Sequence, residues 1–261
     1  TLIAARIYRI PVVVHESDAV PGRVNQRAGQ WAKRVAISFP DAVKYFPKER
    51  TALTGVPVRK SILGGELEQA KEIIGVFSSK PVIFVLSGSQ GARIINHTVV
   101  QILKDLLKKY EIIHQAGEKN YEDLLLETKP VIESGEEAYY HLTPFLDENK
   151  MRSAYFLADL VISRAGSSIF EIAAVGKPAI LIPLKHAAQD LQRQNAYQYA
   201  RRGGAVVIEE DNLTPSVLLH EIQTLLGDPE RLKQMARAAQ NFARPDAAEL
   251  IAKEILTLGL H

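Results

Sequence analysis

The segment ISRAGSSIFEIAAVGKPAILIPLKHAAQDLQRQN, residues 162–195, decides the fold of this chain. It begins at the end of an apolar strand, turns at Gly166, and continues through a helix and a second apolar strand at 179–182 into a loop rich in amide side chains. A strand, a tight turn and a helix in this order form one βα unit, and successive units build a parallel sheet. Such sheets bind their ligands at the carboxyl ends of the strands, so the turn and the loop are the expected binding segments.

The residues after the turn suit a nucleotide sugar. Ser167 and Ser168 can cap the helix. Glu171 falls in the first turns of that helix, where a carboxylate is favoured and can accept two hydrogen bonds from a ribose diol. The loop 186–195, which contains Gln192, suits sugar hydroxyls, although a solvated helix start has the same composition.

The composition excludes several classes of protein. The chain has 261 residues, 46% of them hydrophobic, which is enough for one large or two modest domains. A formal net charge of +2 gives no strong field for nucleic acid or for an anionic membrane. The chain has no cysteine, and no spacing of its seven histidines pairs two on one helix face, so neither a metal nor a cofactor is expected.

Short β-branched runs alternate with amphipathic segments, which is the pattern of parallel βα units. The runs predict strands at residues 12–15, 35–38, 52–54, 82–86, 111–115, 139–142, 160–163, 179–182 and 205–208. The amphipathic segments predict helices at residues 22–33, 94–109, 148–157, 168–175, 191–202, 215–226, 229–242 and 247–258.

Glycine and proline between residues 55 and 65 interrupt this periodicity and mark a linker. The three strands before it are too few for a doubly wound sheet, whereas the six after it form a complete Rossmann-like set. We expect the remainder of an N-terminal domain at 1–57, a ligand-binding Rossmann-like domain at 58–244, and a helix at 245–261 that crosses back to the first domain. Because Thr1 opens the chain without methionine, we also expect the native chain to begin earlier.

Three further segments are candidates for ligand contact. Residues 87–93, SGSQGAR, form a glycine turn whose N–H groups can hold a diphosphate, unless the glycines serve only to turn the chain. The cluster HESD at 15–18 follows a strand and can contact substrate or cap the next helix. Arg59 can reach a phosphate or a base edge from the linker, or be an ordinary surface arginine. The acidic run 209–211 predicts a solvated turn.

Together these segments resemble the MurG family, the transferases that add N-acetylglucosamine to undecaprenyl-diphosphate-linked muramyl-pentapeptide in cell-wall synthesis. In the family's order and near its spacing, the chain carries PVVVHESDAVPGRVN (11–25), SFP (38–40), TGVPVR (54–59), SGSQGARIIN (87–96), SRAGSSIFEIAAVGKPAILIP (163–183) and HAAQDLQRQNA (186–196). The resemblance implies an α/β fold of GT-B type, with two Rossmann-like domains built on parallel sheets. It also implies that the N-terminal domain is incomplete in this chain, without the glycine-rich loop that faces the acceptor.

The resemblance further implies a set of contacts to the donor, UDP-GlcNAc. These are Asp18 near the sugar, Arg59 beside the nucleotide sugar, Ser89 on the diphosphate, Leu146 on uracil through its backbone, Ser167, Ser168, Ile169 and Phe170 in the ribose and phosphate turn, Glu171 on the diol, and Gln192 on the sugar hydroxyls. Asp18 stands where many relatives have asparagine. Gly166 and Glu171 are one residue closer than is usual in the family, which leaves the match of the two serines open by one position.

The implied reaction is inverting transfer of N-acetylglucosamine to the C4 hydroxyl of the muramyl residue, at the cytoplasmic face of the bacterial membrane and without metal, cofactor or nucleic acid. The general base stays open: His15 and Glu16 are candidates, and the missing N-terminal loop is an equal one. Two alternatives remain. The chain could be a donor-binding module that is inactive without a partner N-terminal half, or another UDP-sugar enzyme such as a glycolipid synthase or a UDP-GlcNAc epimerase.

Overall fold

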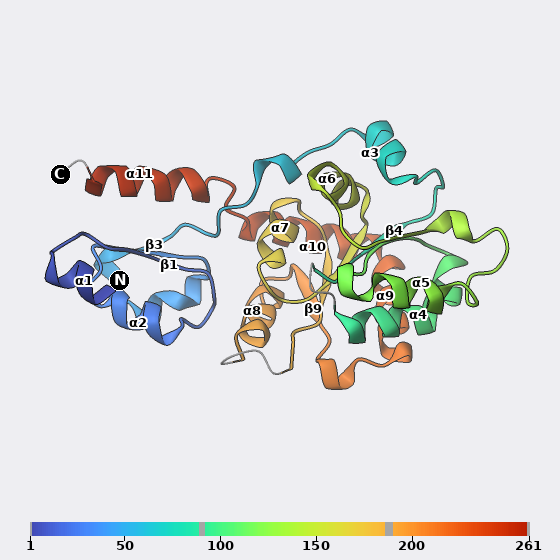
Figure 1. Cartoon of the computed structure of the whole chain (residues 1–261), viewed down its shortest axis with the longest axis horizontal. Coiled ribbons are helices and arrows are strands. Elements are labelled where there is room, and N and C mark those ends of the chain that lie inside the picture. The colour runs from blue at the N-terminus through green and yellow to red at the C-terminus, as the bar shows by residue number, and fades with distance from the viewer. Residues whose placement is uncertain (1, 89–91, 186–189, 260–261) are drawn as a thin grey trace.

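The computed structural model describes residues 2–88, 92–185 and 190–259, which form a smaller and a larger lobe side by side (Figure 1). The smaller lobe contains a three-stranded parallel sheet in the order β1-β2-β3. Its elements are α1 (Leu2–Ile7), β1 (Val13–Glu16), α2 (Arg23–Gly29), β2 (Arg34–Ile37) and β3 (Thr51–Leu53).

The larger lobe contains a six-stranded parallel sheet in the order β6-β5-β4-β7-β8-β9. Its strands are β4 (Val82–Leu86), β5 (Glu111–Gln115), β6 (Tyr140–Thr143), β7 (Leu160–Ser163), β8 (Ala179–Leu181) and β9 (Ala205–Val207). Its helices are α3 (Leu67–Ile74), α4 (Arg93–Leu107), α5 (Tyr121–Thr128), α6 (Glu148–Leu157), α7 (Ser168–Ala174), α8 (Leu191–Ala200), α9 (Pro215–Leu226) and α10 (Pro229–Phe242).

The order of the strands locates a crevice. The chain runs outward from β4 through β5 to β6, returns to the other side of β4 to form β7, and continues to β9. The order therefore reverses between β4 and β7. At such a switch point the loops after the two strands diverge to opposite faces of the sheet, which opens a crevice at its carboxyl edge.

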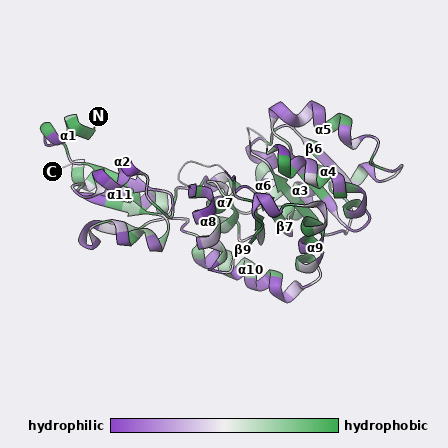
Figure 2. Cartoon of the chain, turned by 90° about the horizontal axis from the view of Figure 1, so that it is seen from below, coloured by the Kyte–Doolittle hydropathy of each residue, from purple (hydrophilic) through white to green (hydrophobic). Residues whose placement is uncertain are grey.

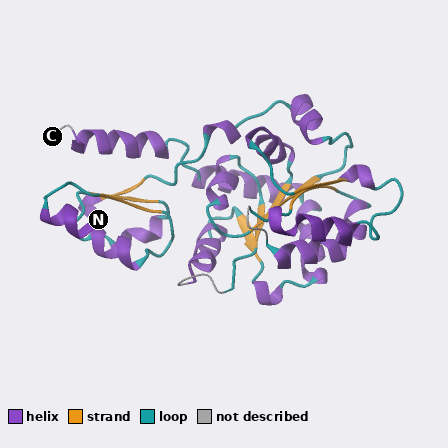
Figure 3. Ribbon diagram, viewed as in Figure 1, coloured by secondary structure: helices purple, strands orange, loops and turns teal. Residues whose placement is uncertain are grey.

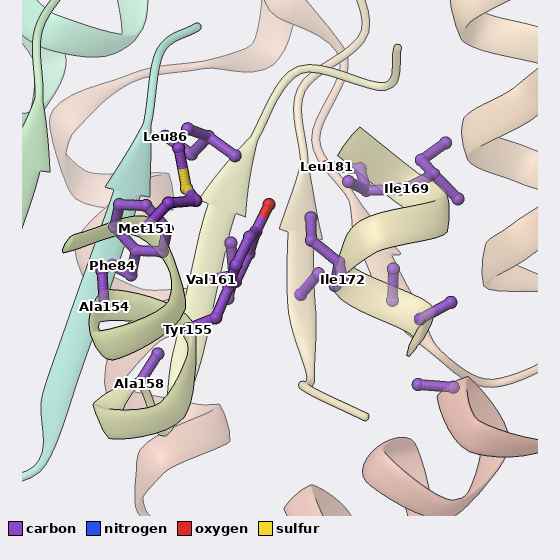
Figure 4. Close-up of a cluster of buried hydrophobic side chains, with 14 of the residues drawn as sticks. Phe84, Leu86, Met151, Ala154, Tyr155, Ala158, Val161, Ile169, Ile172 and Leu181 are labelled. Carbon is purple, nitrogen blue, oxygen red and sulfur yellow. The ribbon is translucent and has the colours of Figure 1, made fainter. Parts of the chain in front are cut away.

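Successive side chains along a strand point to opposite faces of the sheet, and because the strands of the large sheet are buried, two cores form, one on each face. Val82, Phe84 and Leu86 face one core, and Ile83 and Val85 face the other. Figure 4 shows the first core, where side chains of α6 and α7 pack against β4, β7 and β8; the ring of Phe84 meets that of Tyr155 edge-on at 5.3 Å between centroids. Figure 2 shows the same distribution, with hydrophobic residues gathered on the strands and the inner faces of the helices.

Two crossings of the chain join the lobes (Figure 3): one between β3 and α3, and one between α10 and α11 (Ala247–Gly259). Helix α11 lies beside the smaller lobe, where Arg34 Nε is 2.6 Å from Glu254 Oε1. At the first crossing Gly55 adopts φ +83°, and a Cβ there would stand 2.5 Å from Cβ of Arg244 on the second. Only glycine allows the two crossings to approach this closely.

The predicted strands all form, with ends shifted by one residue at most. Helix α2 ends at Gly29, earlier than the periodicity predicts, because the chain must turn back to enter β2. In the larger lobe two short helices were missed, α3 and α5, each of which packs on a longer one, α6 and α4 respectively. Within the described ranges, no helix has the length and apolar character that crossing a membrane requires.

Candidate functional site

The crevice at the switch point is bounded by the turns after β4 and β7. Gly88, in the first turn, has φ +71°, and a Cβ at either Gly88 or Gly166 would meet no atom within 4 Å. Both glycines therefore face open space, where a ligand can approach the backbone. Ser89, the residue expected on the diphosphate, lies outside the described residues.

A buried network of polar side chains supports the first turn. Ser87 Oγ donates to Asn96 Oδ1, and Asn96 Nδ2 donates to the carbonyl of Ala116 at 3.0 Å. His114 Nε2 is 3.1 Å from Asn96 Oδ1, so this nitrogen carries the proton, while Nδ1 accepts from Tyr140 Oη at 2.9 Å. Complete burial lowers the pKa of His114 to about 3 and keeps the ring neutral. Sequence analysis did not anticipate this network, because its members alternate with apolar core residues.

In the second turn the serine hydroxyls do not cap the helix, contrary to the prediction. Ser168 Oγ donates to the carbonyl of Arg164 at 3.0 Å and lies 3.0 Å from Ser163 Oγ, and Ser167 occupies the N-cap position without a side-chain hydrogen bond. The side chains of Ile169 and Phe170 are buried. Neither side chain is therefore free to contact a ligand in this structure.

Glu171 and Arg59 lie 112 positions apart in sequence and meet at this turn. Arg59 donates to Glu171 Oε1 through Nη2 at 2.9 Å and through Nε at 3.3 Å. The other carboxylate oxygen accepts from Tyr155 Oη at 3.2 Å. Burial, together with this carboxylate, raises the pKa of Tyr155 well above its usual value and keeps it a donor. Tyr155 is a site residue that the sequence analysis missed, since it lies in an otherwise ordinary amphipathic helix.

Leu146 follows β6, on the far side of β5 from the crevice turns. Its side chain is buried in the first core, and Thr143 Oγ1 donates to the neighbouring carbonyl of Phe145 at 2.9 Å. Leu146 as a whole is only 3% exposed, so the expected contact of its backbone with uracil stays a prediction.

Gln192, at the start of α8, accepts a hydrogen bond at Oε1 from the N–H of Leu184 at 3.1 Å. This contact ties α8 to the segment that leaves β8. The rest of the predicted sugar loop, residues 186–189, lies outside the described residues.

The acidic run after β9 forms the predicted turn, but only Asp211 is exposed, and each of the three carboxylates pairs with a cation. Glu209 Oε1 is 2.7 Å from Arg193 Nε, and Asp211 Oδ1 is 2.5 Å from Lys185 Nζ. Glu210 Oε2 is 2.6 Å from Nη1 of Arg164, the residue that opens the β7 turn, and accepts from the N–H of Lys185 at 3.3 Å. The run thus holds the β7 turn, the segment after β8 and α8 together.

The HESD cluster of the smaller lobe ends β1 and faces the larger lobe. Glu16 is buried; it accepts from the N–H of Asp18 at 2.9 Å and from Asn25 Nδ2 at 3.0 Å. Burial, opposed by these hydrogen bonds, raises the pKa of Glu16. His15 Nε2 donates to the carbonyl of Gly55 at 2.9 Å. In this arrangement Glu16 shapes the loop that carries Asp18, whereas His15 ties the end of β1 to the first crossing at Gly55.

One asparagine connects the two lobes across the cleft. Asn195, on α8, donates from Nδ2 to Asp18 Oδ1 at 2.7 Å and accepts at Oδ1 from the N–H of Ala19 at 2.8 Å. Beside this clamp, the ring of Phe39 lies 5.4 Å from that of Phe170 and 5.5 Å from that of Phe242. Polar and aromatic contacts together fix the angle between the lobes in this structure.

The described residues contain no group of three or more histidine, aspartate or glutamate side chains that could hold a metal ion. The arrangement instead offers cationic and N–H donors for phosphates at the crevice, and carboxylate and amide groups for hydroxyls. Such a set of groups suits a nucleotide diphosphate linked to a sugar.

Comparisons with known proteins identify the family of the chain. Residues 82–251 match the model of the glycosyltransferase family 28 C-terminal domain. A UDP-N-acetylglucosamine–N-acetylmuramyl-(pentapeptide) pyrophosphoryl-undecaprenol N-acetylglucosamine transferase from Geobacter metallireducens is 41% identical over 262 residues, 98% of this chain and 69% of the relative. The chain belongs to this family of transferases. Another member, from Thermodesulfovibrio yellowstonii, is 38% identical over 96% of this chain and 68% of its own length.

Comparison with solved structures finds a member of the same family with a similar fold. The crystal structure of Acinetobacter baumannii MurG has a TM-score of 0.77 and 31% identity, and the match covers 98% of this chain and 69% of that one. The expected α/β fold of GT-B type, with parallel sheets, is confirmed. A UDP-GlcNAc 2-epimerase from Neisseria meningitidis, bound to UDP-GlcNAc, has a TM-score of 0.71 at 13% identity over 98% of this chain and 72% of that one, and so shares the fold alone with this member of the MurG family.

Proposed function

We propose that the chain transfers N-acetylglucosamine from UDP-GlcNAc to the C4 hydroxyl of undecaprenyl-diphosphate-linked MurNAc-pentapeptide, with inversion at the anomeric carbon. Membership in the transferase family supports the choice of donor and acceptor. The observation that carries the proposal is the meeting of Arg59, Glu171 and Tyr155 beside the switch-point crevice, opposite the Asp18 loop of the other lobe.

The donor would lie across the crevice. The N–H groups of the turn after β4 and of the turn after β7 would hold the diphosphate, since helix N-termini favour anions. Glu171 would accept both hydroxyls of the ribose, and Tyr155 would keep its carboxylate oriented. Arg59, which now bonds Glu171, is long enough to turn toward the diphosphate once the diol replaces it.

The acceptor would enter between the lobes, beside Asp18. Its C4 hydroxyl would attack the anomeric carbon while the bond to UDP breaks on the opposite side of the sugar. Fixed cations and N–H donors stabilise the negative charge that develops on the leaving diphosphate. In this proposal Glu16 positions the Asp18 loop and His15 ties β1 to the first crossing, and the group that takes the acceptor's proton is left unassigned.

The proposed acceptor carries a lipid chain, so the protein would bind a membrane peripherally; in this proposal it does so at the cytoplasmic face. In the smaller lobe, α1 and the residue after it expose large apolar side chains next to two arginines, a composition suited to a membrane surface: Ile3, Ile7, Tyr8, Arg6 and Arg9.

Two assays test the proposal. Titration calorimetry should detect binding of UDP-GlcNAc, and Glu171→Gln, which keeps the shape of the side chain, should weaken it at least about tenfold by removing the charged acceptor of the diol. Incubation with the lipid-linked acceptor should release UDP. Donor binding without transfer would reduce the chain to a donor-binding module, and epimerisation of the donor at C2 would make it an epimerase; either result overturns the proposed activity.

A further inference from the structure

A groove of about 550 Å³ lies between the lobes, lined by residues other than those of the candidate donor site. The smaller lobe contributes Ser38, Pro40 and Leu53 to its walls, and the larger lobe contributes the two residues that follow α8, residues of α10 and the crossing that follows α10. The groove is therefore a feature of the arrangement of the lobes and not of either lobe alone.

Among the described residues that line this groove, four are arginines and none is acidic: Arg201, Arg202, Arg237 and Arg244. In the part of the chain that the structure describes, none of the four forms an ion pair, although other arginines of the same helices do. Arg193 on α8 pairs with Asp190 and Glu209, and Arg231 on α10 pairs with Glu221.

Helix ends explain only part of this cluster. Arg201 is the C-cap residue of α8 and Arg202 follows it, positions at which a cation is favoured by the helix dipole. Arg237 lies inside α10, however, and gains nothing from a helix end. Gln234 and Asn241, one turn to either side of it on the same helix, add neutral hydrogen-bonding groups to the wall.

Four guanidinium groups around one concave surface repel one another, and the repulsion is relieved when an anion binds among them. The planar guanidinium fork matches the oxygens of phosphate groups better than any other side chain. We propose that this groove is a second anion site, separate from the donor crevice, which binds a ligand carrying a phosphate or diphosphate group. Since both lobes line the groove, such a ligand stabilises the lobe arrangement seen in this structure.

Calorimetric titration with inorganic pyrophosphate at low salt tests the site directly. The double variant Arg201→Gln, Arg237→Gln should bind pyrophosphate at least about tenfold more weakly than the unmodified chain. A matched control, Lys109→Gln with Lys129→Gln, removes the same net charge at exposed positions far from the groove, and should bind as the unmodified chain does. Thermal unfolding of all three proteins checks that each is folded, as expected for substitutions of exposed side chains.

Repeating the titration with saturating UDP separates this site from the donor crevice. Pyrophosphate binding that persists with UDP and depends on the arginines supports the site, whether or not UDP-GlcNAc proves to be a substrate. Equal affinity in the arginine variant and the unmodified chain, or complete loss of the signal with UDP present, overturns it.

Vesicle flotation identifies the source of the phosphate group. Vesicles of phosphatidylglycerol and of phosphatidylcholine are compared for the unmodified chain and the two double variants. Binding to phosphatidylglycerol that is lost only in the arginine variant assigns the site to a lipid headgroup. If pyrophosphate binding depends on the arginines in the titration above, equal flotation of all three proteins assigns the site to a soluble phosphate ligand.

Discussion

Asn195→Ala removes the clamp between the lobes, and its cost follows from the two bonds lost. The bond to the Asp18 carboxylate is charge-assisted, worth about 2 kcal/mol, and the bond from the Ala19 N–H is worth about 1 kcal/mol. Because Ala19 is only 2% exposed and Asn195 only 3%, water cannot readily replace these partners. The docking of the two lobes should therefore be weakened by about 3 kcal/mol.

Urea unfolding measures the loss of docking free energy, and the Michaelis constant for UDP-GlcNAc measures the effect of that loss on donor binding. The lobes should separate before either unfolds, and the constant should rise because Asp18 no longer stands opposite the donor crevice. Gln194→Ala is the matched control, since the neighbouring side chain is exposed on the same helix. A loss of less than about 0.5 kcal/mol, with an unchanged constant, would refute the role of the clamp.

Three further changes test separate parts of the site. Gln192→Ala should weaken UDP-GlcNAc far more than UDP, and an equal loss for both ligands would contradict the sugar-reading role. Glu210→Gln, which weakens the ion pair with Arg164, should raise the Michaelis constant for the donor several-fold and leave turnover nearly unchanged. Glu230→Gln, which removes the carboxylate of an exposed ion pair, is its control. Parallel effects in the two variants would contradict the role of Glu210 in positioning the β7 turn. His114 is neutral in the fold with its pKa lowered to about 3, whereas the unfolded chain protonates it near its ordinary value. Stability should therefore fall below about pH 6, by up to about 1.4 kcal/mol per pH unit from this group, and acid unfolding of His114→Gln should lack this contribution.

The βα pattern of the larger lobe was predictable because its strands are buried on both faces. A continuous apolar run such as 82–86 has few alternatives to a central strand, and the runs at 111–115 and 160–163 formed with the predicted ends. The two short helices were not predictable in the same way. Helices of eight residues have little stability of their own, and α3 and α5 form because α6 and α4 offer surfaces to pack against.

The candidate site, too, was predictable from the sequence only in part. Sequence order placed Gly166 and Glu171 after a strand, and parallel strands bring such turns to one edge of the sheet. The roles of individual polar groups depended on partners distant in the chain. Ser168 donates to a backbone carbonyl instead of capping the helix, and the acidic run at 209–211 forms ion pairs with three cations.

The sequence by itself determined the class of fold and the turns that can bind a ligand, because hydrophobic period and glycine act over a few residues. The tertiary structure alone decided that Arg59 and Tyr155 share Glu171, that Asn195 joins the lobes through Asp18, and that four arginines without an ion pair to any described residue gather around one groove. The Asn195 clamp and the groove depend on the angle between the two lobes, whereas the Glu171 contacts depend on how α6, α7 and the first crossing meet in the larger lobe. Both are set by packing among residues that no local pattern connects.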